Sequence, residues 1–241
     1  MKKTYDDSSI SSLKGADRVR LRPGVIFGSD GLDGCCHSMF EILSNSIDEA
    51  REGYGKVIDI TRFADNSIQV EDFGRGIPVG YNEKEGRFNW ELIFCEMYAG
   101  GKYNNNSGDN YEYSLGLNGL GACATQYSSE YMDVEVRRDG KIHRLHFEKG
   151  ENIGGLQSED TRFKATGTKI KWRPDLDVFT DIDIPVDYFL SVLKKQAVVN
   201  SGIKFVFHNQ NEDKSFTDYE FVYENGITDY VNELAGEKSL T

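Results

Sequence analysis

The sequence lacks any stretch suited to export or to membrane insertion. Its first residues, MKKTYDDSSISSL, contain no apolar run of signal-peptide length, and no run anywhere approaches the roughly eighteen apolar residues of a membrane helix. We therefore expect a soluble, cytoplasmic protein that makes no contact with a membrane.

Positive charge is also in short supply. The 241 residues include 28 Lys and Arg against 40 Asp and Glu, which gives a formal net charge of −12. A domain with this charge repels the phosphate backbone of nucleic acid rather than attracting it. If the protein acts on DNA, another part of it contacts the DNA.

Cysteine pairs and the common nucleotide-binding patterns are missing too. Cys35, Cys36, Cys95 and Cys123 form no CxxC motif, which favours reduced thiols in the cytosol over zinc or disulfides. Neither the GK[ST] of a P-loop nor the Rossmann order GxGxxG occurs. A nucleotide, if one binds, is held by a different scheme.

What is present is enough apolar material for one large domain, with 38% hydrophobic residues, 14 Phe and 13 Tyr. Alternating apolar residues predict strands over 57–63 and 67–73, joined as a hairpin, and over 131–137, 141–147, 167–174, 203–208 and 217–223. Helical spacing predicts helices over 13–24 (stopped by Pro23-Gly24), 32–54, 89–99, 185–199 and 227–235. Hairpins with helices inserted between them predict an α+β fold, a two-layer α/β sandwich.

Two segments have no core pattern. Residues 1–12 are polar and aperiodic, so we expect an extended arm ahead of one domain over 13–241. The stretch GGKYNNNSGDNYEYSLGLNGLG, residues 100–121, is rich in glycine and asparagine. A loop of this length in a compact domain is usually a functional lid or a disordered segment.

The helix predicted around FEILSNSIDEA carries a polar stripe. His37, Glu41, Asn45 and the pair Asp48/Glu49 fall on nearly one line at helical spacing. One interpretation is a solvated face, which is the commoner case. Because apolar residues occupy much of the circumference, the alternative is a buried helix in which His37 orients Glu41 to take a proton from water and Asn45 offers an oxygen to Mg²⁺.

Two further motifs suit a nucleotide. In EDFGRGIP, residues 71–78, Asp72 ends a strand, and the glycines after it let the backbone approach a planar ligand closely. Asp72 can then accept a hydrogen bond from an exocyclic amine of that ligand. The same pattern also fits a tight turn with a solvated Asp. GLNGLG, residues 116–121, places glycine amides at a helix N-terminus, which is an anion site, and Lys102 adds a positive charge. The TGT at 166–168 is weak alone.

Taken in order, these segments resemble the N-terminal ATPase domain of the B-type subunits of bacterial type IIA topoisomerases. The matching stretches are YDDSSISSLKGADRVRLRPG, NSIDEA, EDFGRGIPV, YAGGKY, SLGLNGLG, TGTKIKWRPD and VVNSG, and together they cover essentially the whole chain. This family lies within the GHKL ATPases, so the resemblance implies a Bergerat fold, a mixed and mostly antiparallel sheet with helices on one face.

The resemblance also implies roles for single residues. Glu41 matches the general base for ATP hydrolysis, His37 its orienting partner, and Asn45 the Mg²⁺ ligand. Asp72 matches the acceptor of the adenine amine, assisted by Thr168 through water. The lid around the phosphates matches Gly100, Gly101, Lys102, Gly116, Leu117, Asn118, Gly119, Leu120 and Gly121. The rim of the adenine pocket matches Asp48, Glu49, Arg75 paired with Glu49, Gly76, Ile77 and Pro78, and aminocoumarin-type inhibitors reach Arg138.

The implied assembly is larger than this chain. Tyr5 matches the arm residue that crosses to a second copy of the B subunit and contacts its nucleotide, so ATP acts as a dimer clamp over captured double-stranded DNA. An A-type subunit supplies the DNA-cleaving tyrosine. Because the family's γ-phosphate lysine lies in a following transducer domain, we expect this chain alone to bind ATP·Mg²⁺, turn over slowly and stay monomeric.

The sequence departs from the family in the lid. SLGLNGLG replaces the usual SGGLHGVG, with Leu115 for a glycine and Asn118 for a histidine, and Glu112 stands where a lysine is common. We expect lid closure or phosphate affinity to differ. The alternatives to a topoisomerase are a GHKL nucleotide switch for a protein partner, or a binding module that has lost ATP. Gyrase and topoisomerase IV are not distinguished.

Overall fold

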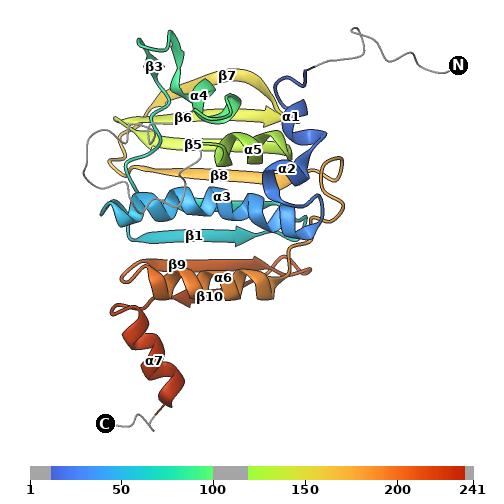
Figure 1. Cartoon of the computed structure of the whole chain (residues 1–241). Helices are drawn as coiled ribbons and strands as arrows, with labels where there is room; N and C mark the ends of the chain where they lie inside the picture. The colour runs from blue at the N-terminus through green and yellow to red at the C-terminus, as the bar shows by residue number, and fades with distance from the viewer. Residues whose placement is uncertain (1–11, 100–118, 237–241) are drawn as a thin grey trace, which may run out of the picture.

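The computed structural model describes residues 12–99 and 119–236. Within them, eight strands form one sheet in the order β10-β9-β1-β2-β8-β5-β6-β7 (Figure 1). Only β1 and β9 pair in parallel, and the other neighbours are antiparallel. The strands are β1 (Val57–Arg62), β2 (Ile68–Asp72), β5 (Ser129–Arg138), β6 (Lys141–Glu148), β7 (Glu151–Asp160), β8 (Gly167–Pro174), β9 (Lys204–Gln210) and β10 (Phe216–Phe221). The predicted α+β fold with a mixed, mostly antiparallel sheet is confirmed.

The helices gather on one face of this sheet, as Figure 1 shows for α3, α4, α5 and α6. The described helices are α1 (Asp17–Arg20), α2 (Pro23–Phe27), α3 (Leu32–Arg51), α4 (Asn89–Cys95), α5 (Gly121–Tyr127), α6 (Val186–Val199) and α7 (Ile227–Ala235). None of them is both long and apolar enough to cross a bilayer. The core lies between the two layers.

Alternation along the strands decides which face the helices cover. On β8, Thr168, Ile170 and Trp172 are buried, whereas Lys169 and Lys171 are partly exposed on the other face. Successive strand residues point to opposite faces, so one face is apolar and the other charged. The apolar face packs against the helices, and none of the described helices covers the charged face (Figure 1).

The hairpin between β1 and β2 follows from its turn residues. Asn66 adopts a left-handed conformation with φ of 64°, and the Phe63 amide donates to the Ser67 carbonyl at 2.9 Å. Asn tolerates this conformation better than most residues. The predicted turn at Ala64-Asp65-Asn66 is therefore confirmed, and it sets the register that brings Asp72 to the end of β2.

Several predicted boundaries were wrong. Pro23 does not stop a helix but begins α2, because its fixed φ and missing N–H suit the first helical position. The helix predicted over 89–99 ends at Cys95, and α3 ends at Arg51 rather than 54. The edge strand β7 and the short hairpin of β3 (Tyr81–Asn82) and β4 (Arg87–Phe88) were missed. The predicted arm falls almost wholly outside the described residues.

Candidate functional site

The polar stripe predicted on α3 belongs to a helix that is mostly buried. Met39, Ile42, Leu43 and Ile47 are at most 1% exposed, and they pack toward the sheet. The stripe on α3 faces the start of α5 and the end of β2. The stripe itself is graded: His37 is exposed, Glu41, Asn45 and Glu49 are partly exposed, and Asp48 is buried. The interpretation of the stripe as a solvated face therefore fits His37 and fails at Asp48.

Glu41 is held from two sides. His37 Nε2 lies 3.2 Å from Glu41 Oε1, and His37 Nδ1 lies 3.1 Å from the Phe27 carbonyl oxygen. A carbonyl oxygen and a carboxylate oxygen both only accept hydrogen bonds, so His37 bridges Phe27 and Glu41 when both of its ring nitrogens carry a proton. The imidazole is thereby fixed in orientation, and it fixes the carboxylate in turn.

The N-terminus of α5 closes the other side of Glu41. A Cβ placed on Gly121 would lie 2.2 Å from Glu41 Oε2, so only glycine allows the first turn of α5 to approach this closely. Helix N-termini present free amides and favour negative charge. The predicted helix start after GLNGLG is confirmed, with Leu120 as its N-cap residue and Gly119 just before it at φ 55°.

Asn45 is one turn beyond Glu41. Its Nδ2 donates to the Glu41 carbonyl at 3.0 Å, which fixes the amide and leaves Oδ1 without a donor among the described residues. Side-chain amide oxygens are suitable Mg²⁺ ligands. No group of three His, Cys, Asp or Glu side chains in the described segments is arranged to hold a metal, so a magnesium ion here would take most ligands from a substrate and water.

Asp72 is the second carboxylate of the site, and it is buried, with 7% of its surface exposed. Its Oδ1 accepts from the Gly74 amide at 3.0 Å and the Thr168 amide at 3.2 Å, and its Oδ2 accepts from Ser46 Oγ at 3.1 Å. Burial raises the pKa of Asp72 above its ordinary value, and these three hydrogen bonds oppose the rise. The arrangement is a fixed acceptor at the end of a strand.

Glycines let the backbone close around Asp72. A Cβ on Gly167 would lie 2.1 Å from the Asp72 carbonyl oxygen, and one on Gly76 would lie 2.7 Å from that of Arg137. Thr168 Oγ1, itself buried, accepts from the Ile77 amide at 3.1 Å. The turn predicted at EDFGRGIP is thus packed directly onto β8, and the interpretation of Asp72 as a solvated turn residue is wrong.

The rim of the site is an ion-pair cluster. Arg75 pairs with Glu49 through Nε and Nη2, both at 2.8 Å, as predicted, and its Nη2 also lies 2.5 Å from Glu52. The Arg75 guanidinium lies 3.9 Å from the ring centroid of Tyr54. Asp48 was also expected at this rim and is buried. The second carboxylate that pairs with Arg75 is that of Glu52.

Two other predicted rim residues bracket the turn. Arg138 Nη1 donates to the Gly76 carbonyl at 2.8 Å, which ties β5 to the turn. Pro78 is exposed just beyond it. Sequence reasoning missed Ser46 and Glu52, since each is one polar residue among many on α3 and only its contact across the fold reveals it.

Part of the predicted site lies outside the described residues. Tyr5 and the lid residues Gly100, Gly101, Lys102, Gly116, Leu117 and Asn118 belong to this part. The described residues nonetheless bring together the segments that the sequence separated. His37, Glu41 and Asn45 lie on α3 facing α5, and Asp72 and Thr168 meet where β2 pairs with β8.

Comparison with known proteins shows the family to which this chain belongs. No family model matches the chain. It is 40% identical over 231 residues to the DNA gyrase B subunit of Halalkalibacterium halodurans, covering 95% of this chain and 35% of that protein. Identity to the DNA gyrase B subunit of Thermotoga maritima is 37%, over 98% of this chain and 36% of that one. Identity to the DNA topoisomerase 4 B subunit of Salmonella typhimurium is 36%, over 97% and 36%.

A solved structure agrees with these relatives. The 43K ATPase domain of Thermus thermophilus gyrase B, in complex with an aminocoumarin, matches with a TM-score of 0.78 and 31% identity, over 95% of this chain and 57% of that one. The chain spans only 35% to 36% of the length of the relatives named above. It belongs to the family of DNA gyrase and topoisomerase IV B subunits, in the part that forms the ATPase domain.

Proposed function

We propose that this chain binds ATP with Mg²⁺ and hydrolyses it, as the ATPase domain of a type IIA topoisomerase B subunit. The observation that carries the proposal is the fixed position of Glu41, between His37 and the start of α5. A carboxylate oriented by a histidine at a helix N-terminus has the geometry of a general base beside bound phosphates.

Recognition of adenine is assigned to the buried end of the site. Asp72 uses three protein donors to fix its carboxylate, and a carboxylate oxygen accepts more than one hydrogen bond. The exocyclic amine of adenine is a donor of the right kind. Thr168 lies beside Asp72 and assists through water, while Gly76 permits the close approach of a flat ring.

Hydrolysis is assigned to the α3 end. Glu41 takes a proton from water as the water oxygen attacks the γ-phosphorus and ADP leaves. His37 holds the carboxylate in place, and the amides at the start of α5 stabilise negative charge on the phosphates. A bound Mg²⁺ would neutralise phosphate charge there, and Asn45 Oδ1 would be its protein ligand. The predicted lid residues, Gly100 to Lys102 and Gly116 to Gly121, would complete the phosphate site.

In the complete subunit, this activity would drive strand passage. Residues 1–12 would form a dimerisation arm and 13–241 the ATP-binding domain, with Tyr5 contacting the nucleotide of a second copy. The net charge of −12 fits a role in which other domains contact the double-stranded DNA and an A-type subunit cleaves it. Work on chromosomal DNA would place the protein in the cytoplasm. Aminocoumarin binding at the rim, near Arg75 and Arg138, is part of the proposal.

Binding is tested by calorimetric titration with a non-hydrolysable ATP analogue, with and without Mg²⁺. We expect saturable binding that Mg²⁺ strengthens, and a loss of about 10- to 100-fold in Asp72→Asn, since a hydrogen bond to a charged group is removed. Asp59→Asn is the matched control, because Asp59 is a part-buried carboxyl on β1 away from the site. Equal affinity of Asp72→Asn and the wild type would refute the adenine assignment.

The role of the complete subunit is tested by reconstitution with its A-type partner. ATP-dependent introduction of negative supercoils into relaxed plasmid would mean gyrase, and decatenation without supercoiling would mean topoisomerase IV. Neither activity in an assembly that hydrolyses ATP would refute the topoisomerase assignment while leaving the ATPase assignment intact.

A further inference from the structure

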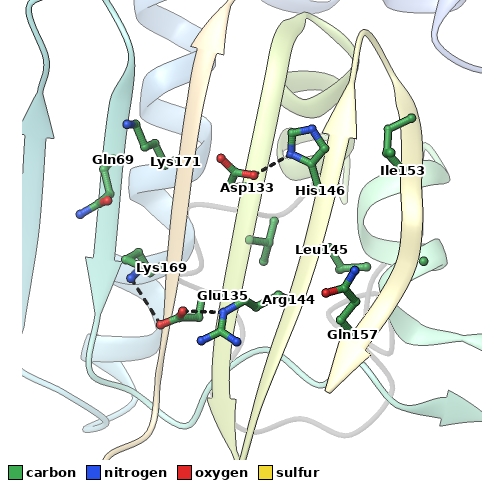
Figure 2. Close-up of a pocket in the computed structure, with 12 residues that line it drawn as sticks. Gln69, Asp133, Glu135, Arg144, Leu145, His146, Ile153, Gln157, Lys169 and Lys171 are labelled. Carbon is green, nitrogen blue, oxygen red and sulfur yellow. Dashed lines mark hydrogen bonds and ion pairs between the residues drawn. The ribbon is translucent and has the colours of Figure 1, made fainter. Parts of the chain in front are cut away.

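The helix-free face of the sheet carries a hollow of about 440 Å³. Figure 2 shows the side chains that line it, rising from β2, β8, β5, β6 and β7 on the side away from the helices. Lys169 enters the hollow, whereas the adjacent Thr168 faces Asp72 on the other side of the sheet. The hollow is therefore separate from the nucleotide site, although both use β2 and β8.

An irregular strand shapes one edge of this hollow. The pairing of β6 with β7 shifts register between Arg144 and His146, where Gly154 and Gly155 adopt φ of 84° and 69°. The Gly155 amide donates to Asn152 Oδ1 at 2.9 Å, and Asn152 Nδ2 donates to the His146 carbonyl at 3.2 Å. A β-bulge of this kind bends the strand and redirects side chains.

The charged side chains of Lys169, Glu135 and Arg144 form a row across the hollow, and each is paired with a charge of opposite sign. Lys169 lies 3.3 Å from Glu135, and Arg144 lies 3.1 Å from the same carboxylate. Arg144 also reaches Glu159 at 2.6 Å. The carboxylate of Glu135 is thus shared by two cations, whose attraction holds its pKa below the ordinary value against the effect of burial.

In the neighbouring row, formed by Lys171, Asp133 and His146, the charge of Lys171 has no such partner in the described segments. Lys171 pairs in register with Asp133, but Asp133 binds His146 Nδ1 at 2.7 Å instead. Across the described ranges, no carboxylate lies within ion-pair distance of Lys171. Its ammonium lies 4.2 Å from the ring centroid of Phe63, a weaker interaction than a buried ion pair. The Lys171 ammonium at the hollow can therefore still donate hydrogen bonds to a ligand.

The lining contains three cations, Arg144, Lys169 and Lys171, and two carboxylates, Asp133 and Glu135. Because Glu159 also pairs with Arg144, Lys171 is the lining cation that has no ion-pair partner among the described residues. Gln69 and Gln157 line the same hollow, and their amides have no hydrogen-bond partner in the described part of the chain. Ile153, 48% exposed, lies on the opposite side of the hollow, beyond Asp133 and His146. Near Lys171 the hollow thus offers one cation and a neutral amide.

We propose that this hollow binds a small organic anion. Its carboxylate or phosphate group would lie at Lys171, with Gln69 beside it as a donor, and the rest of the molecule would extend into the hollow. A volume of this size suits a small molecule. A nucleic-acid strand is disfavoured, because the next cations along the face are already paired, Arg137 with Glu71 and Arg173 with Glu130.

The experiment follows amide chemical shifts and calorimetry on this chain, titrated with phenyl phosphate, benzoate, inorganic phosphate and acetate at constant chloride. A saturating non-hydrolysable ATP analogue is present throughout, so that binding at the nucleotide site does not contribute. We expect phenyl phosphate or benzoate to bind with a dissociation constant of about 1 mM or tighter. The better of the two pairs identifies phosphate or carboxylate as the preferred group.

Three variants decide whether the hollow is the site. Lys171→Gln should weaken binding about tenfold or more, whereas Lys195→Gln, the same charge change on the exposed side of α6, should not. Glu135→Gln should strengthen binding, because it releases Lys169 and Arg144 from their shared carboxylate. Thermal melts confirm that each variant folds. Equal weakening by the two lysine variants, weaker binding in Glu135→Gln, or no saturable binding of any probe would overturn the proposal.

Discussion

The two carboxylates of the proposed nucleotide site stand in contrasting surroundings. Asp72 is 7% exposed and receives three hydrogen bonds from β8, the following turn and α3. The Glu41 side chain is 27% exposed and is held by one histidine and by the close approach of Gly121. One end of the site is completed inside the described fold. For the other end, several of the predicted lid residues lie outside the described residues.

This difference in burial matches the different roles proposed for Asp72 and Glu41. An acceptor for a flat, uncharged ring gains specificity by being fixed before the ligand arrives, because no reorganisation is then required. A base that must take a proton from water needs access to that water, so it cannot be buried to the same degree. The fold accordingly concentrates its buried hydrogen bonds on Asp72 and positions Glu41 by contact.

Removing the proposed base, Glu41, should give the largest effect. In Glu41→Gln, assayed in the complete subunit, we expect turnover to fall at least about 100-fold, because the amide cannot accept the proton from water. Affinity for a non-hydrolysable analogue should change less than about threefold. Glu83→Gln, the same change on the exposed β3–β4 turn, serves as control. Turnover that survives in Glu41→Gln would remove Glu41 as the base and with it the contrast between the two ends.

Displacing the base without removing it should give the next largest effect. The Cβ of Gly121→Ala would overlap Glu41 Oε2, so the carboxylate or the start of α5 has to shift. We expect turnover to fall about 10- to 100-fold, since small misplacements of a catalytic group are costly, with a smaller change in analogue affinity. Gly80→Ala is the matched control, because its Cβ meets no atom within 4 Å and its φ is not positive. An unchanged rate in Gly121→Ala would show that Glu41 is not held by contact.

Local pattern accounts for much of what the sequence predicted. The β1–β2 hairpin, α3, α6 and α7 follow from periodicity and from turn residues such as Asn66, and the predicted bounds of α7 match the structure. The Glu49–Arg75 pair was also predicted and is present. The pair joins a helix to a strand end, and it was reached through family resemblance rather than through spacing.

What the sequence did not reveal depends on contacts across the fold. Strand β7 was missed because Gly154 and Gly155 break its alternation, and most of its residues are exposed at the sheet edge. Pro23 was misread because proline interrupts a helix interior but is well suited to the first turn of a helix, and the sequence alone does not separate the two cases. Ser46 gains its importance from Asp72, 26 residues away, and no local signal separates it from the other serines of α3.

Asp72 provides a test of the buried end that needs no nucleotide. Its folded pKa is raised by burial, so the stability associated with its protonated form is fully present below 3.8, the ordinary pKa, and is lost as pH rises through the folded pKa. Asp72→Asn should therefore melt above the wild type at pH 7, by about 2–4 °C for each kcal/mol of burial cost removed. The difference should shrink toward pH 4.

The matched comparison is again Asp59→Asn. Burial also raises the pKa of Asp59, but this side chain is only partly buried, so its gain at pH 7 should have the same sign and be smaller. Thermal melts of the three proteins between pH 4 and 8 measure both effects. If Asp72→Asn melts below the wild type at pH 7, the hydrogen bonds to the charged carboxylate outweigh its burial cost, and the buried end is held by charge rather than by shape.

The rim should matter least. Arg75 forms three contacts with Glu49 and Glu52, yet its side chain is 44% exposed, and solvent screening reduces what such pairs contribute. We expect Arg75→Gln to lower the free energy of unfolding by less than about 1 kcal/mol and to change analogue affinity less than about threefold. Urea unfolding at low and at high salt measures the first effect. A loss well above 1 kcal/mol that persists at high salt would mean that the rim is part of the fixed end, because only a pair shielded from solvent keeps its strength when salt is added.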